Sequence, residues 1–384
     1  MKGNKLILRD IWFILLCTCG GFLLSLTGMS IGWMIGTLMA ACFFSFLRPA
    51  WSGIPDAGKG VNKLWLNLGQ LILGVELGQK LNGSVVSIFL ENWLTVTIML
   101  ILSIVFALLT GLYLYRFSQS DILTSFVGTA PGGMSAMPGI AQEVGANTAT
   151  VTLVQTIRVL LVVLTIPILV FFLHSHDIGG SSPAAPAAIP ASATGQLSLA
   201  GIGITVCFFL IAWAGAFAGK KLRIPARWLL GSMLAVAITQ VISGALGFEP
   251  TAWWPQGMNV ISQLFLGASI GSRFHKEMFR GVRKTLTVAF TGSIGFVIAM
   301  LLCALVVSKV TGISLTTSIL AFSPGGIAEM ASTSVALHAD STFVVTVQVL
   351  RLILVIAMLP PLFRFLHLRT ERVKRKKIHS LKTR

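Results

Sequence analysis

The chain has 384 residues, of which 55% are hydrophobic and only 11% are charged. Soluble domains carry about 25% charged residues, so this composition excludes an ordinary soluble protein and indicates that the lipid bilayer is the solvent of the chain. The net charge is +17, and many of the basic residues lie in short loops and in a basic tail. This placement is explained by the cytoplasmic orientation of those segments and by contact with anionic lipid, rather than by binding of nucleic acid.

The apolar runs come in two sets of five, and several reach the roughly 20 residues that a membrane-spanning helix needs. The first run follows basic residues, as in a signal peptide, but the second half carries its duplicate, so we interpret it as the first membrane helix. In chain order the runs are Ile11–Leu26, Trp33–Leu47, Leu64–Leu77, Trp93–Tyr115 and Thr150–Leu173, then Leu199–Ala218, Trp228–Leu246, Val260–Ile270, Leu286–Val307 and Thr342–Leu366.

The second half repeats the motifs of the first. A Pro-Gly-Gly motif recurs at a shift of 193 positions (324 − 131), and a Trp-x-x-Gly motif recurs at a shift of 195 (228 − 33). In a membrane protein, an internal duplication of this kind indicates a transporter fold. The residues repeated around the Pro-Gly-Gly motif are Pro131, Gly132, Gly133, Gln155 and Arg158, matched by Pro324, Gly325, Gly326, Gln348 and Arg351.

The loop charges predict that the two halves face opposite ways in the membrane. In the first half the loop 27–32 has no Lys or Arg, whereas the corresponding loop 219–227 of the second half is strongly basic and the next loop, 247–256, has neither. Opposite orientations require an odd number of crossings in each half. We therefore expect an all-α polytopic protein with two inverted repeats, each of about five transmembrane helices plus one Pro-Gly-Gly segment.

That segment is predicted to be a re-entrant hairpin, with a broken helix that crosses the membrane as the alternative. The predicted organisation is a first repeat over 1–173, a Ser/Pro/Ala-rich linker over 174–197, a second repeat over 198–368 and a basic tail over 369–384.

The Pro-Gly-Gly motifs are candidate substrate sites because each interrupts an apolar run. Proline removes a backbone donor and glycine admits angles that a helix cannot use, so free helix ends arise at membrane depth. A helix N-terminus there can hold an anion. Two tight turns that only pack helices closely are the structural alternative.

Arg158 and Arg351 lie within the last apolar run of each half, and Gln155 and Gln348 precede them by three residues on the same helix face. An arginine inside a membrane costs a few kcal/mol and is a functional candidate by default. The alternative is structural: each arginine pairs with a carboxylate or with loosened carbonyls of the hairpin.

The carboxylates differ between the halves. Glu329 follows the second Pro-Gly-Gly motif, but its counterpart is Ala136 (329 − 193), so Glu329 is the preferred residue for proton or ion coupling, with a salt bridge to Arg351 or Arg158 as its alternative role. Glu143 and Glu76 are further coupling candidates. Asp340 is another, although its place just before the last helix also predicts a helix cap.

No motif for nucleotide hydrolysis, no nucleophile motif and no cluster of metal ligands is found, so the chain is predicted not to be an enzyme and to carry no metal or cofactor. A short His-x-His-Asp tract in the linker lacks further ligands.

The segments Thr129–Met137 and Ser323–Ala331, with the Trp-x-x-Gly and Gln-x-x-x-Gly motifs, resemble the AbrB family of duplicated bacterial membrane proteins. Members of that family carry conflicting labels: regulator of gene expression, ammonia monooxygenase and transport protein. The family is in turn similar to cation-proton antiporters and anion symporters with inverted repeats, which implies a core domain that moves against a panel domain.

The sequence therefore predicts a secondary active transporter of a small, anionic metabolite, coupled to protons or another ion and working by alternating access. The alternatives are a membrane regulator of gene expression that does not transport, or a monooxygenase-like enzyme. We expect a multi-pass protein of the bacterial plasma membrane with both termini in the cytoplasm, a small-molecule substrate, lipid contacts and a homodimer as one oligomeric option. Substrate identity, transport direction and coupling ion are left open.

Overall fold

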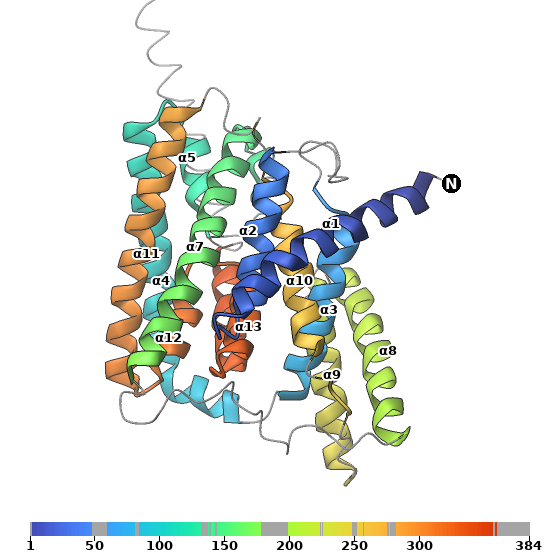
Figure 1. The fold of residues 1–384 in the computed structure, drawn as a ribbon. Helices are drawn as coiled ribbons and strands as arrows, with labels where there is room; N and C mark the ends of the chain where they lie inside the picture. The colour runs from blue at the N-terminus through green and yellow to red at the C-terminus, as the bar shows by residue number, and fades with distance from the viewer. Residues whose placement is uncertain are drawn as a thin grey trace, which may run out of the picture. The chain divides into compact units, whose positions relative to one another are not determined.

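The chain is helical, and the described part of the computed structural model contains no strand. The structure describes residues 2–47, 60–80, 84–131, 137, 140–142, 144–177, 199–222, 224, 226–247, 252–255, 257–274, 276, 282–355 and 358. Figure 1 labels the helices α1 (Lys2–Ser25), α2 (Gly32–Leu47), α3 (Lys63–Lys80), α4 (Ser84–Phe117), α5 (Ile122–Thr129), α7 (Thr148–Asp177), α8 (Leu199–Lys221), α9 (Arg227–Ala245), α10 (Gly257–Gly271), α11 (Arg283–Thr311), α12 (Leu315–Phe322) and α13 (Ile327–Ala336). A last helix spans Ser341–Val355.

Six helices in the described part of the chain are long and apolar enough to cross a membrane. On α4 the exposed apolar side chains Leu94, Ile98, Ile101, Val105 and Leu109 recur every three or four residues, so they form one stripe that faces outward. Large exposed apolar surfaces are rare on soluble monomers, and here they are the surface that meets lipid. The prediction of an all-α polytopic membrane protein is confirmed. The six spans are Leu6–Ser25, Asn92–Phe117, Thr148–Leu173, Gly201–Lys221, Arg227–Ala245 and Arg283–Thr311.

The chain divides into two compact units, and these do not coincide with the two predicted repeats. The first unit comprises Met1–Glu91, Pro167–Met278 and Ile327–Val344, and the second comprises Asn92–Ile166, Phe279–Gly326 and Val345–Arg384. Each unit takes helices from both halves: α1–α3 and α8–α10 belong to the first, whereas α5, α11, α12 and most of α4 belong to the second. A sequence repeat in this chain is therefore not a compact domain.

The boundaries predicted for the repeats stay predictions, although α7 continues to Asp177 and so extends into the segment predicted to be a linker. Residues 178–197 of that linker and the tail 369–384 lie outside the described residues.

In the first unit, glycines allow neighbouring helices to touch through their backbones. Gly20 of α1 faces Gly36 of α2, and Gly215 of α8 faces Gly231 of α9. A Cβ atom on Gly36 would lie 2.2 Å from the carbonyl oxygen of Gly20, and one on Gly231 would lie 2.6 Å from that of Gly215. The two pairs are separated by 195 positions (231 − 36), so this contact recurs with the shift of the Trp-x-x-Gly motif.

Replacing Gly36 with Ala is expected to lower the thermal midpoint of the purified protein in detergent. The new methyl group cannot be accommodated unless α1 and α2 move apart, and overpacking of this kind costs about 1–3 kcal/mol. The control is Gly203→Ala in α8, because a Cβ atom there meets nothing within 4 Å. Equal midpoints for the two variants would contradict a rigid α1–α2 contact.

The third helices of the two halves exchange partners. α3 packs on α9, and α10 packs on α2. A Cβ atom on Gly74 of α3 would lie 2.7 Å from the carbonyl oxygen of Leu229, and one on Gly267 of α10 would lie 2.7 Å from that of Met34. The exchange explains why helices from both halves share one compact unit.

α3 and α10 also pack on each other. The Ser262 hydroxyl donates a hydrogen bond of 3.0 Å to the carbonyl of Gly69, the residue 193 positions earlier, and the rings of Trp65 and Phe265 lie 5.1 Å apart. Moving forward along α3 from Trp65 to Gly69 means moving backward along α10, so the two helices are antiparallel. Antiparallel packing of equivalent helices is what inverted repeats require. The inverted orientation of the complete halves stays a prediction.

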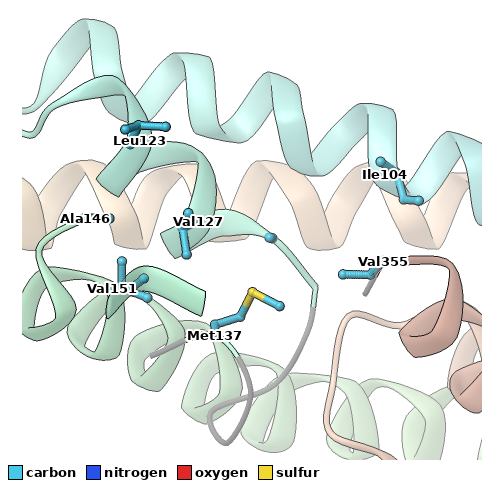
Figure 2. Close-up of a cluster of buried hydrophobic side chains, with 9 residues drawn as sticks. Ile104, Leu123, Val127, Met137, Ala146, Val151 and Val355 are labelled. Atoms are coloured by element: carbon cyan, nitrogen blue, oxygen red, sulfur yellow. The ribbon is translucent and has the colours of Figure 1, made fainter. Parts of the chain in front are cut away.

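The second unit has a buried apolar core around the first Pro-Gly-Gly region. Figure 2 shows side chains from α4, α5, α7 and the last helix converging on the segment between α5 and α7. The members of this core are Ile104, Leu123, Val127, Ala130, Met137, Ala141, Ala146, Val151 and Val355.

Candidate functional site

Each Pro-Gly-Gly motif follows a short helix with a polar cap. Asp121 caps α5 and Ser314 caps α12, each by accepting a backbone N–H of the first turn. The residue before each proline leaves the helix in an extended conformation, with ψ of 135° at Ala130 and 142° at Ser323. Proline imposes this conformation on its predecessor, so it fixes where both helices end.

The first break turns back toward the side from which it came. The N–H of Asn147, at the start of α7, donates to the Thr124 hydroxyl in the first turn of α5 at 2.9 Å. Further along α7, Gln155 donates to the carbonyl of Ala130 at the end of α5, at 2.8 Å. The two helices therefore run side by side in the same direction, so the chain must come back before α7 begins. A re-entrant hairpin has this property, and the hairpin stays a prediction.

Arg158 and Gln155 hold the first break by its carbonyl groups. Arg158 Nη1 donates to the carbonyls of Thr129 at 2.8 Å and Ala130 at 3.2 Å, and its Nη2 donates to Gln155 Oε1 at 2.6 Å. Gln155 Nε2 donates in turn to the carbonyls of Val127 at 3.3 Å and Ala130 at 2.8 Å. Carbonyls at a helix end lack a partner within the helix, so these two side chains satisfy them.

Arg351 and Gln348 hold the second break in the same way. Arg351 Nη1 donates to the carbonyl of Ser323 at 2.6 Å, and Nη2 donates to that of Gly325 at 3.0 Å and to Gln348 Oε1. Gln348 Nε2 donates to the carbonyls of Leu320 at 2.9 Å and Ser323 at 3.1 Å. Of the structural roles predicted for the arginines, pairing with loosened carbonyls is the one observed.

Both guanidinium groups are buried and lack a countercharge in the described part of the chain. The exposed fraction is 4% for Arg158 and 5% for Arg351, and neither forms a salt bridge with a described carboxylate. The Nε atom of each is buried without a hydrogen-bond partner. The two positive charges also act on each other. Because buried unpaired charge is costly, this pair is an arrangement suited to an anion.

Glu329 lies in the first turn of α13 and is influenced by the positive charge of Arg273. Its carboxylate accepts a hydrogen bond from its own backbone N–H, at the helix end where negative charge is favoured. α13 packs against α10, and Arg273 follows the end of that helix. Burial lowers the pKa of the Arg273 guanidinium, and the charge of Glu329 opposes that shift.

Arg273 is a residue that the sequence interpretation missed, since it considered only Arg351 and Arg158 as partners for Glu329. A signal was present: Arg273 is the counterpart of Lys80 (273 − 193), and Lys80 follows Glu76 by one helical turn. In the structure Lys80 Nζ lies 3.0 Å from Glu76 Oε1. Lys80 therefore pairs with a carboxylate on its own helix, α3, whereas the equivalent Arg273 acts on a carboxylate of another helix, α13.

The remaining coupling candidates have distinct surroundings. Glu76 is buried, and its Oε2 has no hydrogen-bond partner among the described residues. Asp340 Oδ1 accepts the backbone N–H groups of Thr342 at 3.1 Å and Phe343 at 2.9 Å, which is the geometry of a helix cap. Glu143, like Gly132 and Gly133, lies outside the described residues. Their predicted roles stay predictions.

Comparisons with known proteins match most of the chain. The family model described as "Transition state regulatory protein AbrB" matches residues 33–367. The "Uncharacterized protein YhjN" of Bacillus subtilis (strain 168) is 57% identical over 96% of this chain and 95% of its own length. The "Putative regulator AbrB" of Escherichia coli (strain K12) is 27% identical over 88% of this chain and 93% of its own length.

Proposed function

This chain belongs to the AbrB family, and we propose that it is a secondary active transporter of a small anionic metabolite, coupled to protons or another ion. The observation that supports this function most is the pair of buried guanidinium groups, Arg158 and Arg351, each anchored at the break of a short helix. An arginine at the centre of a membrane helix costs at least about 2.5–3.5 kcal/mol. A bound anion would offset part of the free-energy cost of these two arginines.

In this proposal the two breaks form the substrate site. Arg158 and Arg351 supply positive charge, and Gln155 and Gln348 fix the guanidinium groups by accepting one hydrogen bond from each. Guanidinium groups bind carboxylates and phosphates through charge-assisted hydrogen bonds, which favours an anionic substrate over ammonium. Pro131 and Pro324, with Gly325 and Gly326 after the second proline, keep the described backbone of the two breaks non-helical.

Glu329 is the proposed coupling residue. When its carboxylate is ionised, the positive charge of Arg273 attracts it. Protonation removes that attraction and so changes how firmly α13 is held. Because Ala136 has no carboxylate at the equivalent position, coupling in this scheme resides in the second half. Glu76, Glu143 and Asp340 are the secondary candidates.

The division into two compact units supports alternating access, because that mechanism needs two bodies that move relative to each other. We further propose that the protein lies in the bacterial plasma membrane with both termini in the cytoplasm, and that no enzymatic reaction is part of its function.

A regulator of gene expression that does not transport is the second candidate, and the name of the Escherichia coli relative, "Putative regulator AbrB", favours it. A regulatory phenotype can also arise indirectly when a transporter changes the level of a metabolite. The basic tail is where a non-transporting regulator would meet a partner, whereas the Pro-Gly-Gly motifs are where a transporter would bind its substrate.

Uptake into proteoliposomes separates the two functions. Purified protein is reconstituted, labelled small mono- and dicarboxylates are supplied under a pH gradient, and uptake is compared with protein-free liposomes. We expect protein-dependent uptake. A protein truncated after Arg369 should retain this uptake, and the Pro324→Ala variant should show less of it. A regulator would give no uptake, and its phenotype in cells would be lost on truncation and kept in Pro324→Ala.

A further inference from the structure

Each buried guanidinium group has N–H donors left over after it has bonded to the carbonyls of its helix break. A guanidinium group carries five N–H donors. Arg158 makes three hydrogen bonds in the described structure, and Arg351 also makes three. The Nε atoms are among the donors that remain, and both are buried without a partner. Buried, positively charged donors of this kind are expected to bind a ligand that supplies negatively charged hydrogen-bond acceptors.

The two guanidinium groups are also held apart as separate anchors. Arg158 is tied to the carbonyls that end α5, and Arg351 is tied to Ser323 and Gly325 after α12. Each is therefore fixed by its own helix break. Their like charges oppose a closer approach.

The charge balance then limits the ligand. No described carboxylate neutralises either guanidinium group. Two such positive charges in a low-dielectric interior are strongly unfavourable, and a monoanion would leave one of them uncompensated. A ligand with two negative groups on one small skeleton gives each guanidinium its own partner. The matching hydrogen bonds of the two halves, related by 193 positions, favour a ligand whose two ends are alike.

We propose that the substrate site takes a small dicarboxylate, with one carboxylate bound by Arg158 and the other by Arg351. This inference rests on the proposed transport function and makes its substrate class specific.

The test compares ligands that share a carbon skeleton and differ in one carboxylate. Dissociation constants are obtained from ligand-dependent thermal stabilisation of the purified full-length protein, with succinate against butyrate and glutarate against pentanoate. We expect the dicarboxylate of at least one pair to bind at least about tenfold more tightly, since hydrogen bonds to charged groups are worth enough for that ratio. Equal constants in both pairs, no stabilisation by either dicarboxylate, or equally tight binding of sulfate would overturn the proposal.

Single substitutions assign the two ends. Arg158→Gln and Arg351→Gln are each expected to bring the ratio between dicarboxylate and monocarboxylate close to one. Arg351→Lys keeps the charge and is expected to keep part of the preference, which separates loss of the charge from a general loss of folding. Arg116→Gln, at the exposed end of α4, is the matched control and is expected to keep the full ratio. An unchanged ratio in either buried variant would refute the assignment.

Failure of this inference and failure of the proposed function look different. Tight dicarboxylate binding without flux in proteoliposomes would support the substrate class and contradict transport. Flux of monocarboxylates as fast as that of dicarboxylates would support transport and overturn the dicarboxylate assignment.

Discussion

Arg351→Gln is expected to lower the initial rate of anion uptake into proteoliposomes by at least about 30-fold, because removing one partner of a buried charged interaction costs about 2–5 kcal/mol. The substitution also removes the hydrogen bonds to the carbonyls of Ser323 and Gly325. Hydrogen exchange of the backbone amides around these residues should therefore become faster in the variant.

The control for this prediction is Arg116→Gln, which removes the same charge from an exposed position. Arg351→Lys should recover only part of the rate, since an ammonium group cannot reproduce the fork that reaches both Ser323 and Gln348. Uptake by Arg351→Gln at the wild-type rate would remove Arg351 from the substrate site.

Glu329→Gln is expected to abolish accumulation driven by a pH gradient while exchange of anion across the membrane continues. Gln cannot release or bind the coupling proton, and it no longer responds to the charge of Arg273. Accumulation and exchange are measured in the same proteoliposome preparation, first with and then without the pH gradient.

Glu76→Gln is the informative comparison for Glu329, because Glu76 is a buried carboxylate of the first half and is paired with Lys80 on its own helix. Normal accumulation by Glu329→Gln, with loss of accumulation by Glu76→Gln, would move the coupling residue to α3.

Much of the candidate site was predictable because its residues stand out against an apolar sequence. Arginine inside an apolar run and proline at the end of one are both unfavourable unless a specific structure compensates them. Arg158 and Arg351 were identified on this basis, and the structure joins each of them to its own helix break. The carbonyl partners could not be named from the sequence, because backbone atoms carry no residue-specific signal.

Contacts between distant segments were less predictable. Nothing local in the sequence connects Arg273 with Glu329, because the two residues lie more than fifty positions apart (329 − 273 = 56). The packing of α3 on α9 and of α10 on α2 depends on glycines such as Gly74 and Gly267. A glycine in the sequence does not reveal which helix it contacts.

Counterflow of labelled succinate tests the central claim most directly, because it needs no coupling gradient and follows a single anion through the site. Proteoliposomes loaded with unlabelled succinate and diluted into labelled succinate should accumulate the label transiently when they contain the wild-type protein. Those with the Arg158→Gln/Arg351→Gln double variant should not. Absence of this transient with folded wild-type protein, or its persistence in the double variant, would contradict transport of an anion through the paired arginines.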